Sequence, residues 1–165
     1  MAFPPIDPIA FRIFGFGIYW YALAYVVGIV LGFRCLLAIN RRLGTPFPED
    51  LLEKFLNWIV LGLLLGGRLG HILYEPMLFW ENPGHIFAIR QGGMSFHGGF
   101  LGVLVTTWLF SRYHHLDFWR LMDLLAVSTP IGLFFGRCAN FVNGELYGRP
   151  TDLPWGIIFP QGGPE

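Results

Sequence analysis

Long apolar blocks are the feature of this sequence that most restricts its fold. A helix that crosses the hydrocarbon core of a bilayer needs about 20 mostly apolar residues. Four stretches approach that length, although the last two are short for full spans: Ile18 to Ile39, Phe55 to Leu73, Phe96 to Phe110 and Leu121 to Phe135. Only 13% of the residues are charged and 54% are hydrophobic, whereas about 25% of a soluble domain is charged. We therefore predict an all-α polytopic membrane helical bundle with about four transmembrane helices, forming a single transmembrane domain over residues 1–165.

Positive charges in the linkers predict the orientation of these helices. Cytoplasmic loops carry an excess of Lys and Arg. The linker 74–95 holds only Arg90, whereas the linkers before and after it, 40–54 and 111–120, hold Arg41, Arg42, Lys54, Arg112 and Arg120. The amino terminus and the residues after Phe135 are therefore expected outside the cytoplasm.

Composition argues against several other functions. The eleven Lys and Arg balance eleven Asp and Glu, so no strong field favours nucleic acid. The two cysteines, Cys35 and Cys138, form no disulfide framework or zinc motif. The five histidines have no metal-ligand spacing, and we expect neither a metal nor a cofactor. The start of the chain lacks a compact basic region and a small-residue cleavage site, which predicts a retained span, not a signal peptide.

Small residues recur at helical spacing in two of the apolar stretches. Gly62, Gly66 and Gly70 follow one another in the second stretch, and Gly98 and Gly102 lie in the third. Helices in lipid pack closely through faces of this kind. We expect these glycines to mark a helix–helix contact.

Ionisable groups at membrane depth are costly and by default mark function. His97, in the string GGMSFHGG, begins the third stretch between Gly92-Gly93 and Gly98-Gly99. A helix N-terminus disfavours the charged imidazole, so His97 is a candidate base, and the glycines allow a substrate close to the backbone. Arg68, in GGRLG, is either functional or a structural group, such as an interfacial anchor or a partner of a carboxylate. Asp123 begins the fourth stretch, where capping of the helix N-terminus accounts for it.

The string GRCANFVNGELYG follows the fourth stretch and concentrates polar groups beside an apolar helix. Arg137 and Asn140 are three residues apart and share a helical face. Asn143-Gly144 is typical of a helix end with a positive φ at glycine. A guanidinium flanked by amides suits a phosphate, which it grips with two parallel hydrogen bonds. Glu145 is expected either to orient Arg137 or to pair with Arg149.

These strings together resemble those of the bacterial prolipoprotein diacylglyceryl transferases. The resemblance covers the whole length in order and includes Asp7-Pro8, WYAL around Tyr21, GGRLG, GGMSFHGG and GRCANFVNGELYG. The last two strings are highly specific. The resemblance implies that His97 and Arg137 are catalytic, with Tyr21, Asn140, Glu145 and Gly148 as supporting positions. Together with the residues singled out above, the predicted substrate-binding set is Arg137, Asn140, Tyr21, Gly98, Gly99, Arg68, Asn143, Glu145 and Gly148.

The resemblance also implies a reaction and its partners. Such enzymes lie in the bacterial inner membrane, with the active site toward the extracytoplasmic side. They move the diacylglyceryl group of phosphatidylglycerol onto the lipobox cysteine of a prolipoprotein signal peptide, releasing glycerol phosphate, without a cofactor. Members of the family are longer, so this chain is expected to be the amino-terminal part of a longer enzyme.

Two other functions fit parts of the pattern. A transporter or channel-like protein would also carry interfacial Arg and Asn, but it tends to show internal repeats, which this sequence lacks. Another lipid-modifying enzyme, such as an acyltransferase using His97, would need an acid in an HxxxxD arrangement, which is absent. The transferase hypothesis requires that His97 and Arg137 lie close enough to share a single anionic lipid.

Overall fold

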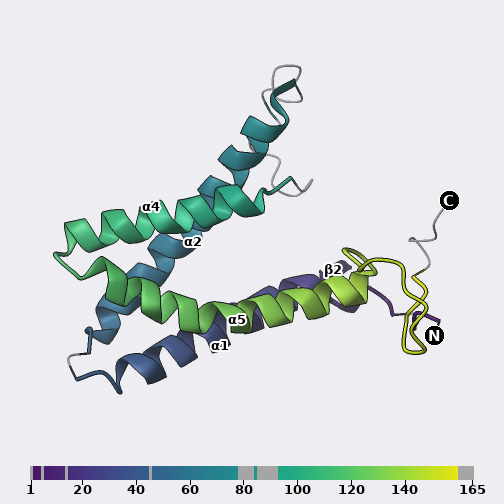
Figure 1. Ribbon diagram of the computed structural model, residues 1–165, viewed down its shortest axis with the longest axis horizontal. Helices are drawn as coiled ribbons and strands as arrows, with labels where there is room; N and C mark the ends of the chain where they lie inside the picture. Colours follow the sequence, from purple (N-terminus) through teal and green to yellow (C-terminus); the bar gives the residue numbers. More distant parts are fainter. Residues whose placement is uncertain are drawn as a thin grey trace. The chain divides into compact units, whose positions relative to one another are not determined.

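The computed structural model describes residues 2–4, 6–13, 15–44, 46–77, 84 and 93–159. Within these residues the main elements are one small hairpin and four helices (Figure 1): β1 (Ile9–Ile13), β2 (Phe16–Tyr19), α1 (Trp20–Asn40), α2 (Glu49–Tyr74), α4 (Phe96–Tyr113) and α5 (Phe118–Asn143). The chain divides into two compact units. Unit 1 comprises Met1–Ala38 and Ala126–Glu165, and unit 2 comprises Ile39–Leu125.

The predicted helical membrane protein is confirmed, with one helix at each of the four apolar stretches. Helices α1, α2 and α5 are long and apolar enough to cross a membrane. Helix α5 is longer than the fourth apolar stretch, because it continues into the string GRCANFVNGELYG as far as Asn143 and has 26 residues. Helix α4 has 18 residues and is not among the three candidate spans found in the described part of the chain.

Helix α2 has an exposed leucine stripe and a glycine face. Leu61, Leu65 and Leu69, spaced four residues apart, are each more than half exposed in the structure. The next residue along the chain from each of them is a glycine, Gly62, Gly66 and Gly70. Successive residues on a helix point in different directions, so the leucines are free to face lipid while the glycines face a neighbouring helix.

That neighbour is α4, which crosses α2 within unit 2 (Figure 1). A Cβ added to Gly66 would lie 2.8 Å from the Cα of Gly102, and one added to Gly70 would lie 2.7 Å from the Cα of Gly98. Real Cβ atoms essentially never come so close to backbone. The predicted glycine contact is therefore confirmed, and it brings the two helix backbones together.

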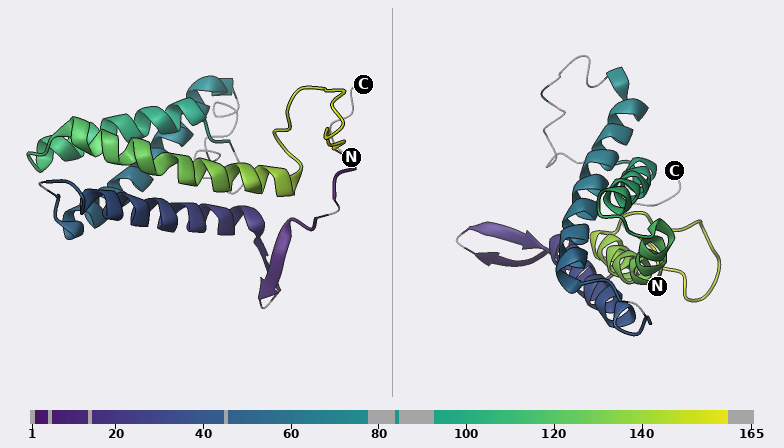
Figure 2. Two further views of the ribbon diagram at one scale, coloured as in Figure 1. Left: turned by 60° about the horizontal axis from the view of Figure 1, so that its bottom comes forward. Right: turned by 90° about the vertical axis from the view of Figure 1, so that its left-hand side faces the viewer.

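Helices α1 and α5 run antiparallel in unit 1 (Figures 1 and 2). Their approach is close at one point, where a Cβ on Gly28 would lie 3.2 Å from the Cα of Gly132. This pairing brings the first turn of α1 and the last turn of α5 to the same end of unit 1.

The hairpin before α1 is a feature that the sequence analysis missed. Strands β1 and β2 pair antiparallel, with Gly15 at φ +84° in the turn, and project from the start of α1 (Figure 2). The Asp7 carboxylate accepts the backbone N–H of Ile9 at 2.8 Å, and the Pro8 carbonyl accepts that of Trp20 at 3.0 Å. The Asp7-Pro8 pair thus begins the hairpin and closes its base against α1.

The start of α5 corrects one prediction. The helix begins at Phe118, and the Asp117 carboxylate accepts the backbone N–H groups of Trp119 at 2.8 Å and Arg120 at 3.1 Å. Asp123 lies further along the helix and does not cap it. The prediction was wrong because the aromatic residues between these two acids already belong to the first turn.

Candidate functional site

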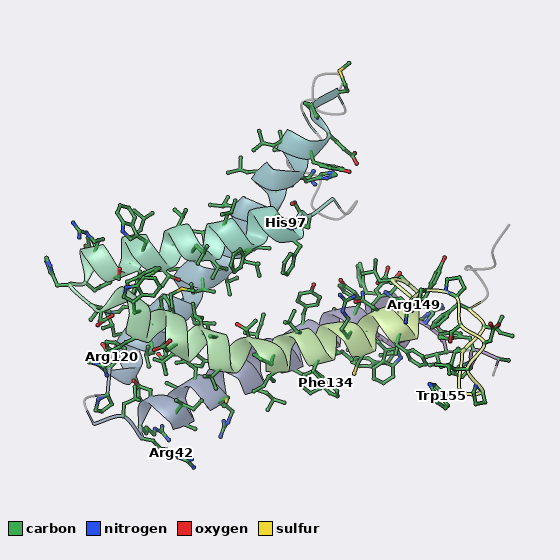
Figure 3. The ribbon with its side chains drawn as sticks, in the orientation of Figure 1. Arg42, His97, Arg120, Phe134, Arg149 and Trp155 are labelled. Atoms are coloured by element: carbon green, nitrogen blue, oxygen red, sulfur yellow. The ribbon has the colours of Figure 1, made fainter. Side chains whose placement is uncertain are left out.

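His97 lies in the first turn of α4, as the sequence predicted (Figure 3). The helix begins at Phe96, and the Ser95 hydroxyl caps it by accepting the backbone N–H of Gly98 at 3.2 Å. The imidazole is exposed, contacts the Phe96 ring edge to face, and has no hydrogen bond to another residue in the described part of the chain. It is thus positioned by backbone and stays accessible to a partner.

The glycines after His97 face α2. A Cβ on Gly98 would lie 2.8 Å from the Cα of Gly70, and one on Gly99 would lie 3.0 Å from the Leu63 side chain. Helix packing alone therefore accounts for both residues, and their role in binding a substrate stays a prediction. Of the glycines before His97, Gly92 lies outside the described residues.

Arg68 is buried against the segment that leads into α4. Its side chain is 9% exposed, and Nη1 donates to the Gly93 carbonyl at 3.0 Å. Gly93 has φ +81°, and a Cβ there would lie 3.1 Å from Arg68 Nη1 and collide with the His71 ring. Of the two possibilities that the sequence left open for Arg68, this contact favours a structural role.

Helix α5 stops within the string GRCANFVNGELYG, as predicted. Gly144 has φ +66°, its N–H donates to the Phe141 carbonyl at 3.0 Å, and the Glu145 N–H donates to the Asn140 carbonyl at 3.0 Å. This pair of bonds is a Schellman motif, which satisfies carbonyls that the helix end would otherwise leave open. The turn directs Glu145 back toward the last helical residues.

Glu145 is consequently held by amides instead of a cation. Its Oε1 accepts from the Asn140 side chain at 3.1 Å and from the Asn143 side chain at 3.2 Å. Among the described residues it forms no ion pair with Arg137 or Arg149, so both expected pairings are wrong. The reason is geometric, because the reversal at Gly144 puts the carboxylate within reach of the two amides.

Two tyrosines complete this group at the start of α1. The hydroxyls of Tyr21 and Tyr25 lie 3.4 Å apart and their ring centroids 5.0 Å apart. Tyr21 also lies near enough to the Asn140 amide and the Glu145 carboxylate for both to influence its hydroxyl. We call Tyr21, Tyr25, Asn140, Asn143 and Glu145 the amide–carboxylate cluster.

Arg137 lies one turn before the amide–carboxylate cluster, in the last two turns of α5. Its side chain is exposed and makes no hydrogen bond or ion pair with any residue that the structure describes. Gly148, beyond the cluster, is also exposed, with nothing within 4 Å of an added Cβ. The guanidinium is therefore open to an anion from outside the chain.

The predicted site residues thus form two groups in separate units. His97, Arg68, Gly98 and Gly99 belong to unit 2, and Arg137 belongs with the amide–carboxylate cluster in unit 1. The proximity of His97 and Arg137 stays a prediction. Sequence reasoning missed Ser95, although a serine just before an apolar helix is a cap signal, and Tyr25, whose spacing of four from Tyr21 was its only sign.

Comparison with known proteins gives a consistent result. The family model described as prolipoprotein diacylglyceryl transferase matches residues 8–165. Relatives named phosphatidylglycerol–prolipoprotein diacylglyceryl transferase include one from Phenylobacterium zucineum, 50% identical over 96% of this chain and 57% of its own length. Another, from Paramagnetospirillum magneticum, is 48% identical over 99% of this chain and 62% of its own length. A third, from Rickettsia bellii, is 46% identical over 98% and 62%. The chain thus spans about three fifths of the length of these relatives.

Proposed function

This chain belongs to the prolipoprotein diacylglyceryl transferase family, and from that premise we propose that it takes part in transferring a diacylglyceryl group from phosphatidylglycerol to the lipobox cysteine of prolipoproteins. The observation that carries the proposal is the open guanidinium of Arg137, one turn from the amide–carboxylate cluster at the end of an apolar helix. A lone cation beside hydrogen-bonding groups at such a place suits a phospholipid head group.

The reaction exchanges one bond at a glycerol carbon. The cysteine sulfur forms a C–S bond to the diacylglycerol carbon, the C–O bond to phosphate breaks, and glycerol phosphate leaves with the bonding electrons. The base takes the thiol proton, so the negative charges of the thiolate and of the phosphodiester both end on the departing glycerol phosphate. A free thiol has a pKa of about 8.5, so only a few per cent is thiolate at pH 7. A base that takes the proton therefore speeds the reaction, and His97 is the residue that we assign to this step.

Arg137 is assigned to the phosphate. Negative charge grows on the phosphate oxygens as the C–O bond breaks, and a guanidinium stabilises that charge through two parallel hydrogen bonds. Its lack of a protein partner among the described residues supports this role.

The amide–carboxylate cluster is assigned to the head group and to the orientation of its neighbours. Asn140 lies on the same helical face as Arg137. Asn143 and Glu145 hold the turn after the helix, and Tyr21 is contributed by the first turn of α1. Gly148, Gly98 and Gly99 remain in the proposed substrate-binding set because they belong to the matching motifs.

The orientation follows from the charges of the linkers. Because the cationic linkers are assigned to the cytoplasm, we propose that the amino terminus and the reacting groups lie on the extracytoplasmic side of the inner membrane. A prolipoprotein cysteine that emerges on that side would meet phosphatidylglycerol of the outer leaflet.

The proposal is tested in bacteria that have been depleted of their own transferase. These bacteria express the natural genomic reading frame that encodes this protein. Mass spectrometry of a reporter prolipoprotein measures the diacylglyceryl thioether on its cysteine. We expect His97→Ala to lower the rate about 10²–10⁴-fold and Arg137→Ala about 10²–10³-fold.

His115→Asn and Arg112→Ala serve as controls, because both residues are exposed and lie outside the two groups, and asparagine tolerates the φ of +53° at position 115. Both should modify the reporter within about twofold of wild type, in line with the usual neutrality of surface changes. If the wild-type protein inserts in the membrane but yields no thioether, the function is wrong. If it is active and the His97 and Arg137 variants are too, the site is wrong.

A further inference from the structure

Arg68 is the buried cation that the proposed chemistry does not use. Charged side chains are seldom buried unless they are paired and hydrogen-bonded, because removal from water is costly. Arg68 is 9% exposed, and its Nη1 donates to a backbone carbonyl, that of Gly93, at 3.0 Å. This hydrogen bond ties the guanidinium to the chain that precedes α4.

Each residue of that segment, 93–95, contacts α2. Arg68 binds the Gly93 carbonyl, and the Gly67 carbonyl accepts the Ser95 N–H at 2.9 Å. A Cβ on Gly67 would lie 2.8 Å from the end of the Met94 side chain. The left-handed φ of Gly93 and its closeness to Arg68 Nη1 leave no room for a side chain.

The same segment sets the start of α4. Ser95 caps the helix through its hydroxyl, and its carbonyl accepts the Gly99 N–H at 2.9 Å. His97 lies between the cap and the glycines that pack on α2. Its backbone position therefore depends on where residues 93–95 are held.

We infer that Arg68 is a positioning residue, which acts through the Gly93 carbonyl and the Ser95 cap to hold His97 in place for proton transfer. The inference rests on the proposed role of His97. This positioning role takes the place of the direct lipid-binding role that the sequence suggested for Arg68. A displacement of about 1 Å in a reacting group can lower the rate about a hundredfold, so loss of the Arg68 contact should lower the rate measurably.

Steady-state kinetics with phosphatidylglycerol and a lipobox peptide separate the two roles. We expect Arg68→Ala in the whole protein to lower kcat about ten- to a hundredfold, with KM for phosphatidylglycerol changed less than about threefold. A KM raised tenfold or more at unchanged kcat would show direct lipid binding and overturn the inference.

Gly93→Ala provides a second route that keeps the arginine and also decides the matter if Arg68→Ala does not fold. A methyl group there strains the backbone, collides with the His71 ring and crowds Arg68 Nη1, so residues 93–95 shift on α2 and the variant should give the same loss confined to kcat. The double variant should be no worse than the poorer single variant, because both changes break one support. Multiplying effects would mean that the two residues act separately.

Amide hydrogen exchange gives a readout that does not depend on activity. In Arg68→Ala, the N–H groups of Ser95, Gly98 and Gly99 should exchange at least about tenfold faster, while those in the middle of α4 keep their wild-type rates. Unchanged exchange at these three groups contradicts the inference. Full activity in His97→Ala would instead refute the proposed function, whatever the exchange data show.

Discussion

The start of α4 and the end of α5 both present polar groups of the signature strings, but they are built differently. His97 is placed by backbone: a glycine face packed on α2, a serine cap and the carbonyl contact of Arg68. The turn after Arg137 is held by side chains, with Glu145 accepting from two amides. The first construction is sensitive to added volume, and the second to exchanged donors and acceptors.

The difference suits the two assigned roles. A base must be held within a narrow range of positions relative to the thiol, and packed backbone moves little. A phosphate-binding end needs hydrogen-bonding groups that adapt to a head group, and Arg137 carries its charge on a long flexible stem. The start of α4 should therefore be disturbed by added side-chain volume, and the end of α5 by exchanged hydrogen-bond donors and acceptors.

Added volume at the α2–α4 contact should have the largest effect. Gly66→Val or Gly98→Val forces a side chain into facing backbone and should cost about 3 kcal/mol or more, the upper end for overpacked cores. Thermal unfolding in detergent measures this loss. Gly136→Ala is the matched control, because nothing lies within 4 Å of a Cβ there. An unchanged unfolding temperature for both valine variants would show that the helices do not pack through these glycines.

Exchanging donor and acceptor in the amide–carboxylate cluster should have an intermediate effect. Asn143→Asp replaces a donor with a second carboxylate beside Glu145, and Glu145→Gln removes the charged acceptor. Each should lower the transferase rate roughly tenfold, since hydrogen bonds to charged groups contribute about 1.5–3 kcal/mol.

The double variant carrying both changes restores one donor and one acceptor with their places exchanged. It should lose less than the product of the two single losses, which a double-mutant cycle measures directly. Independent, multiplying losses would mean that the contact between Asn143 and Glu145 has no part in activity. Neither Asn143→Asp nor Glu145→Gln should change the packing of α2 on α4.

Removing the cap of α4 should have the smallest effect. Ser95→Ala takes away the acceptor for the Gly98 N–H and should destabilise the protein by about 1 kcal/mol, whereas Ser95→Asp keeps an acceptor and should be close to neutral. Thermal unfolding again supplies the measurement. Equal losses in the two variants would show that the hydroxyl does not act as a cap.

Local patterns in the sequence predicted the helices and several of their details well. The apolar stretches identified four helices, the glycine spacing identified the α2–α4 contact, and Asn143-Gly144 identified the end of α5. These features depend on helical periodicity and on the conformations open to single residues, which neighbours along the chain reveal. Asp117, and not Asp123, caps α5 because a cap depends on where the helix begins, which is the least certain part of a helix prediction.

The partners of the polar side chains were decided by tertiary structure. Nothing near Arg68 in the sequence indicates that its guanidinium meets the carbonyl of Gly93. Glu145 is bound by the amides of Asn140 and Asn143 and not by Arg149, although Arg149 is nearer in the sequence than Asn140. A hydrogen bond forms where two groups approach in space, and that approach depends on how helix backbones pack. The sequence by itself determined which segments are helical, where α5 stops and which face of α2 is small. Only the packing of α4 on α2 and of α5 on α1 decided that Arg68 meets Gly93 and that Tyr21 lies near Asn140, because those residues are far apart along the chain.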